Sequence, residues 1–416
     1  MRILFVTPYL PSPPRFGAQR RLEGLMRGLA RRHEVSLLSF SKPGADEDAL
    51  AATREYTHSI TTVPYDVLDV ELGQKRLLQL RSLASRHSFE TLLMRRPEFQ
   101  RELSALLASA AYDVVQVEFS QMGSYQLTRR EPRSPIFVLD EHNIEYDLTR
   151  RTAQAPGSVA RKLYSAANWR KLRSEERSAW QSFDGVVLTS DRDAELLRED
   201  VPLTKTVVVP NGVDIEAFRP SGMPRDPATL LFLGAINYYP NTDGILDFLD
   251  NTWPLILAAR PDTRLQIVGM DPPESVLSQR SENVEVTGFV EDPLPYLARA
   301  SVVVVPLRIG GGTRFKVVEA MSMGKAIVST SLGAEGIDVA HETHALLCDD
   351  AHSFAAAVLR VLGDPALNDR LGHAARQLAE ERYGWRAAVA KLEGFYAQLG
   401  CADSRVRLRQ QLVEVA

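Results

Sequence analysis

Short apolar runs alternate with helical patterns along most of the chain. The first run, residues 2–7, is nearly uninterrupted and therefore typical of a strand buried on both faces of a parallel sheet. Apolar residues then recur at helical spacing to about residue 32, and a second strand is predicted at residues 34–40. This order of strand, helix and strand predicts a doubly wound α/β sheet, in which ligands bind beyond the carboxyl ends of the strands.

The same alternation continues in two series separated by a linker. Residues 215–227 carry prolines and a glycine and lack helical periodicity, so we place a domain boundary in this stretch. Before it, strands are predicted at residues 113–118, 135–139, 184–190 and 207–209, with a long charged helix at about 158–183. After it, strands are predicted at residues 229–234, 264–269, 284–287 and 302–305, with a helix around 244–259. The chain is predicted to end in helices at residues 353–362, 368–382 and 386–399, followed by a polar tail at 401–416.

Residues 46–110 are predicted to be mostly helical and are markedly basic. Leucines interleave there with the cationic residues Lys75, Arg76, Arg81, Arg86, Arg95, Arg96 and Arg101. A basic amphipathic helix of this kind can rest on an anionic membrane. An ordinary helix with a solvated basic face fits the same pattern, so both interpretations stay open.

One stretch, residues 302–330, combines the features of a ligand site. An apolar run leads into three glycines at 310–312, and a helical pattern that contains Glu319 follows. Successive glycines let the backbone approach a ligand closely, and the free N–H groups and positive dipole end of a helix favour an anion. Arg314 and Lys316 add two cations to the first turn of this helix. A flexible loop with two solvated cations is the alternative interpretation.

Further candidates lie at the ends of other predicted strands. His142 directly follows a buried strand, between Glu141 and Asn143, where α/β folds place working residues. A loop histidine that bonds only the backbone fits this position equally well. Gly234 and Gly269 end two successive strands, where they either let a ligand approach the sheet edge or simply start a turn.

Composition and charge narrow the function classes. The chain has 416 residues, of which 44% are hydrophobic and 25% charged, and a net charge of -4, which argues against a dedicated nucleic-acid binder. Its two cysteines, Cys348 and Cys401, lack metal-like spacing, so we expect a reducing compartment and no structural zinc. The loop after the first strand lacks the three-glycine dinucleotide fingerprint, which argues against a nicotinamide or flavin enzyme. No signal peptide or membrane span is predicted, so any membrane contact is expected to be peripheral.

Several motifs, taken in order, resemble those of the family 4 glycosyltransferases, which are retaining enzymes of the GT-B fold. The resemblance covers nearly the whole chain. It rests on the proline-rich loop with Gly17, Asp140-Glu141-His142-Asn143, Val209-Pro210-Asn211-Gly212-Val213-Asp214, Leu231-Phe232-Leu233-Gly234, Thr287-Gly288-Phe289-Val290 and the run from Val317 to Val328.

The resemblance implies two facing Rossmann-like doubly wound domains. Residues 1–215 would form the acceptor-binding domain and residues 216–383 the domain that binds the nucleotide sugar. A helix at residues 384–400 would cross back to the first domain, with 401–416 as a tail. The donor substrate would be a nucleotide diphosphate sugar, and no metal or other cofactor is implied, because fixed cations hold the diphosphate.

The resemblance also implies roles for individual residues. Glu319 would accept hydrogen bonds from the ribose hydroxyls, and Arg314 and Lys316 would hold the diphosphate and stabilise charge as the sugar–phosphate bond breaks. His142 would lie over the sugar near the acceptor. The other residues that the resemblance assigns to the donor site are Gly17, Asn211, Gly234, Gly269, Phe289, Val290, Gly311, Gly312 and Thr313.

Two positions depart from the family pattern. The first glutamate of the paired-glutamate motif is replaced by Gly311, within a Gly-Gly-Gly-Thr-Arg-Phe-Lys loop, and residues 235–241 lack the usual basic pair. Our hypothesis is that Arg314 and Lys316 replace the missing cations.

The function that the resemblance implies is a metal-independent, retaining transfer of a hexosyl group from a nucleotide diphosphate sugar to a glycan or lipid-linked acceptor. The absence of an obvious covalent nucleophile favours front-face attack. A cytoplasmic role in polysaccharide biosynthesis is expected, with peripheral contact at the inner face of the membrane as an open interpretation. The alternative is a non-catalytic GT-B protein that binds a sugar nucleotide or a protein partner. Another enzyme of the same fold, such as an epimerase, would need acid and base carboxylates for which the sequence offers no clear candidates.

Overall fold

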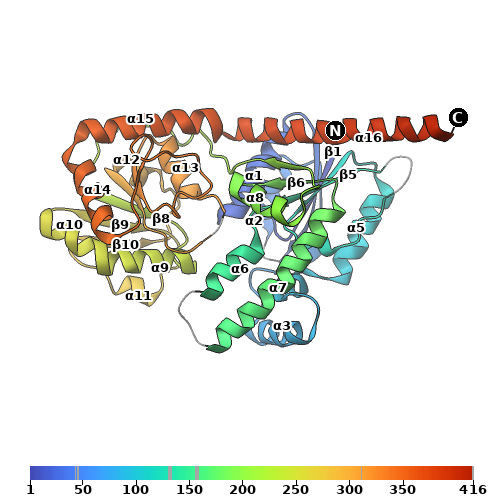
Figure 1. Ribbon diagram of the computed structural model, residues 1–416, viewed down its shortest axis with the longest axis horizontal. Helices are drawn as coiled ribbons and strands as arrows, with labels where there is room; N and C mark the ends of the chain where they lie inside the picture. Colours follow the sequence, from blue (N-terminus) through green and yellow to red (C-terminus); the bar gives the residue numbers. More distant parts are fainter. Residues whose placement is uncertain (43, 45, 130–133, 155–158, 311, 415–416) are drawn as a thin grey trace. The chain divides into compact units, whose positions relative to one another are not determined.

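The computed structural model describes residues 1–42, 44, 46–129, 134–154, 159–310 and 312–414. The chain divides into two compact units, Met1–Pro210 with Ala388–Ala416, and Asn211–Ala387. Each unit is built around its own parallel sheet (Figure 1). The division falls between Pro210 and Asn211, whereas the sequence places it after residue 215.

The first unit contains a seven-stranded sheet with the order β3-β2-β1-β4-β5-β6-β7. The strands are β1 (Arg2–Thr7), β2 (Glu34–Ser41), β3 (Ser59–Pro64), β4 (Val114–Glu118), β5 (Ile136–Glu141), β6 (Gly185–Leu188) and β7 (Thr206–Val208). All neighbouring pairs are parallel. The order reverses between β1 and β4, so the loops that follow these two strands leave the sheet in opposite directions and open a crevice for ligands.

The helices of this unit are α1 (Gly17–Ala30), α2 (Glu47–Arg54), α3 (Leu72–Ala84), α4 (Phe89–Met94), α5 (Pro97–Ser109), α6 (Glu145–Gln154), α7 (Val159–Ser182) and α8 (Asp191–Asp200), with a short 3-10 turn at Met122–Ser124. Two elements differ from the sequence prediction. Strand β3 lies inside the segment predicted to be mostly helical, where the β-branched residues Thr61, Thr62 and Val63 favour a strand. Helix α6 follows His142 closely, in a segment for which no helix was predicted.

The second unit contains a six-stranded parallel sheet with the order β10-β9-β8-β11-β12-β13. Its strands are β8 (Thr229–Leu233), β9 (Arg264–Val268), β10 (Val284–Gly288), β11 (Val302–Val305), β12 (Ala326–Ser329) and β13 (Leu346–Leu347). Its helices are α9 (Tyr239–Asp247), α10 (Trp253–Ala259), α11 (Glu274–Leu277), α12 (Leu294–Arg299), α13 (Phe315–Ser322), α14 (Ala351–Gly363) and α15 (Pro365–Arg382). The strand order reverses again, here between β8 and β11.

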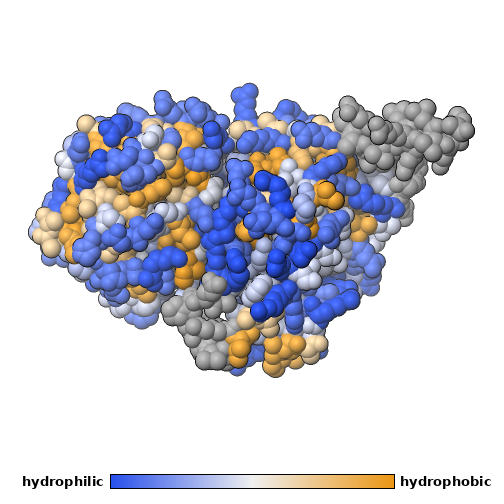
Figure 2. Space-filling view, viewed as in Figure 1, coloured by the Kyte–Doolittle hydropathy of each residue, from blue (hydrophilic) through white to orange (hydrophobic). Residues whose placement is uncertain are grey.

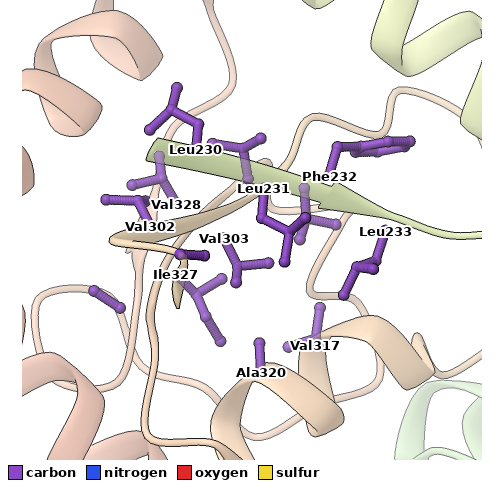
Figure 3. Close-up of a cluster of buried hydrophobic side chains, with 14 of the residues drawn as sticks. Leu230, Leu231, Phe232, Leu233, Val302, Val303, Val317, Ala320, Ile327 and Val328 are labelled. Atoms are coloured by element: carbon purple, nitrogen blue, oxygen red, sulfur yellow. The ribbon is translucent and has the colours of Figure 1, made fainter. Parts of the chain in front are cut away.

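The core of the second unit fixes the position of α13. Buried side chains of β8, β11 and β12 pack together against one face of this helix, and Val317 and Ala320 of the helix point toward them (Figure 3). The predicted helix around residues 244–259 is divided into α9 and α10 by a π-helical turn, Phe248–Thr252. Pro254 lies in the first turn of α10 and has no N–H to donate, so the regular helical bonding is interrupted before it.

Helix α16 (Trp385–Glu414) returns the chain to the first unit, as the GT-B fold predicts. The contact is close, because a Cβ added at Gly28 would lie 2.4 Å from Cγ2 of Val389, and one at Gly185 would lie 2.5 Å from Cζ of Phe395. The helix continues to Glu414, whereas the sequence predicts a polar tail from residue 401.

Candidate functional site

In the first unit, a group of buried polar side chains lies at the carboxyl ends of β4 and β5. Glu118 ends β4, Asp140 and Glu141 end β5, and His142 follows directly. The strand register pairs Glu118 with Asp140. His142 is 5% exposed and Glu118 is fully buried. The parallel sheet therefore brings the candidate histidine next to a carboxylate at the crevice where its strand order reverses.

Glu118 and Phe119 together hold the imidazole of His142. Nε2 of His142 lies 2.7 Å from Oε2 of Glu118. The ring of Phe119 stacks on the imidazole at 4.0 Å and 25°, from a residue whose φ of 68° lies in the left-handed region. Burial lowers the pKa of His142 to about 3 and raises the pKa of Glu118 to about 7. The imidazole is therefore neutral at pH 7, and its hydrogen bond to Glu118 fixes the orientation of the ring.

Further hydrogen bonds hold Glu118 and its neighbour Asp140 in place. Arg21 donates to both carboxylate oxygens of Asp140, with Nη2 2.9 Å from Oδ1 and Nε 3.1 Å from Oδ2, and its Nη1 donates to the carbonyl of Val209 at 2.8 Å. Nε2 of Gln116 donates to Oε1 of Glu118 at 2.7 Å. The hydroxyl of Tyr396, on α16, donates to Oε1 of Gln116. The helix that returns from the second unit is thus linked to the histidine through Gln116 and Glu118.

The residues of this cluster are of the types that bind metal ions, but their hydrogen bonds disfavour metal binding. Glu118, Asp140 and His142 each offer one ligand atom, and these atoms lie within 4.8 Å of one another. Asp140 already binds the guanidinium of Arg21, which neutralises it, while the amide of Gln116 donates to Glu118. A divalent ion would have to displace or face these donors, so the residues fit a bound arginine better than a metal.

Sequence reasoning did not single out Glu118, Arg21, Gln116 or Tyr396. A signal for Arg21 exists, because it lies four residues before Leu25 on the apolar face of α1 and is buried there. A cation on such a face needs a buried acid as its partner. The identity of that acid, Asp140, does not follow from the spacing.

In the second unit, Lys316 of α13 is buried, and its side chain lies beside the carboxyl end of β8. Its Nζ donates to Oδ1 of Asn241 at 2.7 Å and lies 4.1 Å from the ring centroid of Phe232. Burial, followed by the charge of Arg314, lowers the pKa of Lys316 to about 7. A Cβ at Gly234 would lie 3.0 Å from Nζ of Lys316 and 2.9 Å from Nδ2 of Asn241, so the glycine leaves room for both side chains.

Arg314 immediately precedes α13 and occupies the N-cap position without a side-chain capping bond, whereas the sequence predicts it in the first turn of the helix. Its Nη1 donates to the carbonyl of Gly312, and a Cβ at Gly310 would lie 2.7 Å from its Nη2, so the guanidinium folds back over the glycine loop. Gly312 has a φ of 71°, which favours glycine. Gly311 lies outside the described residues.

The remaining donor-site candidates separate into two groups. Nδ2 of Asn211 donates to the carbonyl of Thr313, the residue before Arg314, at 3.3 Å. Glu319 is 6% exposed on α13, three residues after Lys316, and its charge acts on that lysine. These three residues therefore lie with the cations. Phe289 and Val290 follow β10, which is separated from β8 by β9, and the ring of Phe289 is 67% exposed.

Gly269 and Gly17 are placed by their own strand ends. A Cβ at Gly269 would lie 1.6 Å from the carbonyl oxygen of Gly234, so packing of β9 on β8 requires this glycine, whether or not a ligand binds. Gly17 begins α1, after the loop that follows β1.

Comparison with known proteins matches each of the two units to a glycosyltransferase family. Residues 16–212 match the family described as glycosyl transferase 4-like domain, and residues 227–364 match the family described as glycosyl transferases group 1. The chain belongs to the glycosyltransferases of the GT-B fold.

Solved structures share this fold over nearly the whole glycosyltransferase. Sucrose-phosphate synthase from Thermosynechococcus elongatus is 19% identical, with a TM-score of 0.72 over 97% of this chain and 100% of that chain. Anabaena Alr3699/HepE, solved in complex with UDP, is 15% identical, with a TM-score of 0.65 over 96% of this chain and 100% of that chain. At these identities the likeness establishes the fold alone.

Curated relatives match over different lengths. A Corynebacterium glutamicum protein named GDP-mannose-dependent monoacylated alpha-(1-6)-phosphatidylinositol monomannoside mannosyltransferase is 28% identical over 205 residues, which are 44% of this chain and 54% of that relative. An uncharacterized 44.6 kDa protein from the cps region of Klebsiella pneumoniae is 22% identical over 374 residues, 86% of this chain and 90% of that relative. This glycosyltransferase therefore spans about half the length of the first relative and most of the second. No helix among its described residues is long and apolar enough to cross a membrane.

Proposed function

We propose that this glycosyltransferase moves a hexosyl group from a nucleotide diphosphate sugar to a glycan or lipid-linked acceptor, with retention of configuration and without a metal ion. The observation that carries the proposal is the cationic group at the switch point of the second sheet. There, Arg314 and Lys316 flank the start of α13, one turn before Glu319. Two of the similar proteins have names or complexes that include GDP-mannose and UDP, which supports a nucleotide diphosphate sugar as donor.

The roles follow from the chemistry of each residue. The carboxylate of Glu319 is suited to accept hydrogen bonds from two ribose hydroxyls. Arg314 and Lys316, with the N–H groups at the start of α13, would bind the diphosphate and stabilise the charge that develops as the sugar–phosphate bond breaks. These cations would supply the charge that a divalent ion supplies elsewhere. Asn211, Gly234, Gly312 and Thr313 would shape the diphosphate pocket, with Gly269 supporting it.

Two other parts of the donor are assigned to loops. Phe289 and Val290 would contact the base, because an exposed ring offers a stacking surface. Gly17, at the start of α1, would let the loop after β1 approach the phosphates.

In the first unit, the neutral imidazole of His142 would act on the transferred sugar as a hydrogen-bond partner. Its low pKa excludes the cationic form at pH 7, and Glu118 holds the ring in one orientation. The proposed mechanism is front-face attack through an oxocarbenium-like transition state, in which the leaving diphosphate accepts the proton of the acceptor hydroxyl. The proposal also includes a cytoplasmic role in polysaccharide synthesis and peripheral membrane contact, which the sequence leaves open.

The test is a binding and hydrolysis screen across nucleotide diphosphate sugars, with release of the free nucleotide diphosphate as the readout. We expect one donor to be both bound and hydrolysed. Arg314→Ala should lower kcat about a hundredfold, because a charge-stabilising donor is lost from the leaving group. Arg308→Ala is the matched control, since Arg308 lies in the same loop but is paired with Asp243 and Asp247. Donor binding without turnover, with any acceptor, would refute the enzymatic proposal and favour a binding protein.

A further inference from the structure

Helix α3 exposes four of its five leucines. Leu72, Leu77, Leu80 and Leu83 are 75%, 48%, 65% and 55% exposed. Only Leu78 and Ser82 of this helix are buried. A surface helix normally turns its apolar residues inward, so the outward leucines need another explanation.

Leu163 of α7 extends this apolar surface. It is 67% exposed, and its neighbour Tyr164 is joined to α3 by a hydrogen bond of 3.2 Å between its hydroxyl and Oγ of Ser82. Figure 2 shows the hydrophobic surface at the lower edge of the molecule, where Figure 1 draws α3. We call this surface the leucine face, defined as Leu72, Leu77, Leu80, Leu83 and Leu163.

Cations accompany the leucine face along α3, where the nearest acid in sequence is Glu71, the residue that precedes the helix. Lys75, Arg76, Arg81 and Arg86 are exposed on α3 and just after it. The sequence has no aspartate or glutamate between residues 72 and 88. Within the part of the chain that the structure describes, none of these four side chains forms an ion pair, so their charges are available to a partner.

We propose that the leucine face docks on the surface of an anionic lipid bilayer, with the leucines among the acyl chains and the cations at the level of the lipid phosphates. A bilayer needs no shaped recess, and the leucines stand on the convex outer side of a helix. The long side chain of Arg76 can lie along the apolar surface while its guanidinium reaches the phosphates.

The charge argues against a second copy of the chain as the occupant. A symmetric pairing through this face would set four cations against the same four cations, and like charges in contact are unfavourable. The docking places the first unit at the membrane, and it deepens the proposed function by putting the acceptor-binding unit where a lipid-linked acceptor would lie.

Vesicle partition of the full chain tests the proposal without donor, acceptor or turnover, so it can fail independently of the proposed function. The vesicles are pure phosphatidylcholine, or phosphatidylcholine with about 30 mol% phosphatidylglycerol. We expect partition to the anionic vesicles only, weakened by salt. The triple variant Lys75→Gln, Arg76→Gln, Arg81→Gln should lower the partition coefficient about fivefold for each charge removed.

A second variant and a control separate the two contributions. The triple variant Leu77→Ser, Leu80→Ser, Leu83→Ser should lower the partition coefficient at least tenfold, because three apolar side chains no longer insert among the acyl chains. The control, Leu203→Ser with Arg264→Gln, changes a 97% exposed leucine and an exposed arginine elsewhere and should partition like the wild type. The proposal would be overturned if the wild-type protein did not bind anionic vesicles. It would also be overturned if the leucine and charge variants bound them as well as the wild type does. A dimer that the leucine variant converts to a monomer would overturn it too, because the face would then be a protein interface.

Discussion

The pair formed by Arg21 and Asp140 supports the first unit in a way that a single substitution can measure. Both side chains are almost completely buried, at 1% and 0% exposure, and the guanidinium also donates to the carbonyl of Val209. Arg21→Met keeps the apolar stem and removes the charge. Asp140 would then be a buried carboxylate without its counter-ion, next to Glu118.

Breaking a buried ion pair from one side costs about 3–5 kcal/mol, because the remaining charge stays desolvated. Arg21→Met should therefore destabilise the first unit by about this amount. In the double variant Arg21→Met, Asp140→Asn, the remaining charge is gone, so most of the lost stability should return.

The measurement is hydrogen exchange in the native state, read from peptides of β1 and β5. Peptides of β8 and β11, from the second unit, serve as the internal control and should keep their protection. Burial already raises the pKa of Asp140, and Arg21 opposes that rise. Without Arg21 the folded-state pKa lies further above the unfolded value, so the stability deficit is largest at neutral pH and shrinks as the pH falls. A loss below about 1 kcal/mol, the range of exposed ion pairs, would refute this reasoning.

Three further predictions concern the two halves of the candidate site. Glu118→Gln keeps the shape of the side chain that holds His142 but removes a carboxyl group whose pKa is about 7. We therefore expect kcat to fall about tenfold and the pH profile of kcat to lose its step near pH 7. An unchanged pH profile would contradict this. Lys316 has a pKa of about 7 and loses charge above it, so affinity for the nucleotide diphosphate, measured by calorimetry, should fall about tenfold per pH unit above pH 7. Lys316→Met should abolish that dependence, and a persisting slope would assign it to another group. Gly234 has a φ of 152°, so Gly234→Ala should lower the free energy of unfolding, measured with denaturant, by about 1–3 kcal/mol. The control Gly363→Ala should be neutral, because a Cβ at Gly363 meets no atom within 4 Å. Equal effects of the two substitutions would show that the space around Gly234 is not required.

Much of the fold could be predicted because buried parallel strands appear as uninterrupted apolar runs. Strands β1, β8 and β11 are of this kind. Strand β3 was missed because it lies at the edge of its sheet, where burial is partial and the polar Thr61 and Thr62 weaken the apolar signal. Helix α6 was missed because its apolar residues are few.

For the candidate site, the sequence indicated which residues carry the chemistry but not how they are held. His142 and Lys316 were found from their positions after a strand and at the start of a helix. Their partners, Glu118 and Asn241, come from segments far away in sequence, and the burial that shifts the pKa of each group arises only when the sheet assembles. The same limit applies to the leucine face, because the sequence pattern of α3 does not reveal which side of the helix faces the core.

The return of α16 to the first unit also has a consequence for biosynthesis. A ribosome completes β1 to β7 and then the entire second unit before it makes Val389, Phe395 and Tyr396. Until then the surfaces at Gly28 and Gly185 are uncovered, and Gln116 lacks its hydrogen-bond donor. The first unit can therefore reach its final state only after synthesis of the second, so a nascent chain that stalls before residue 388 would expose apolar surface to chaperones and proteases.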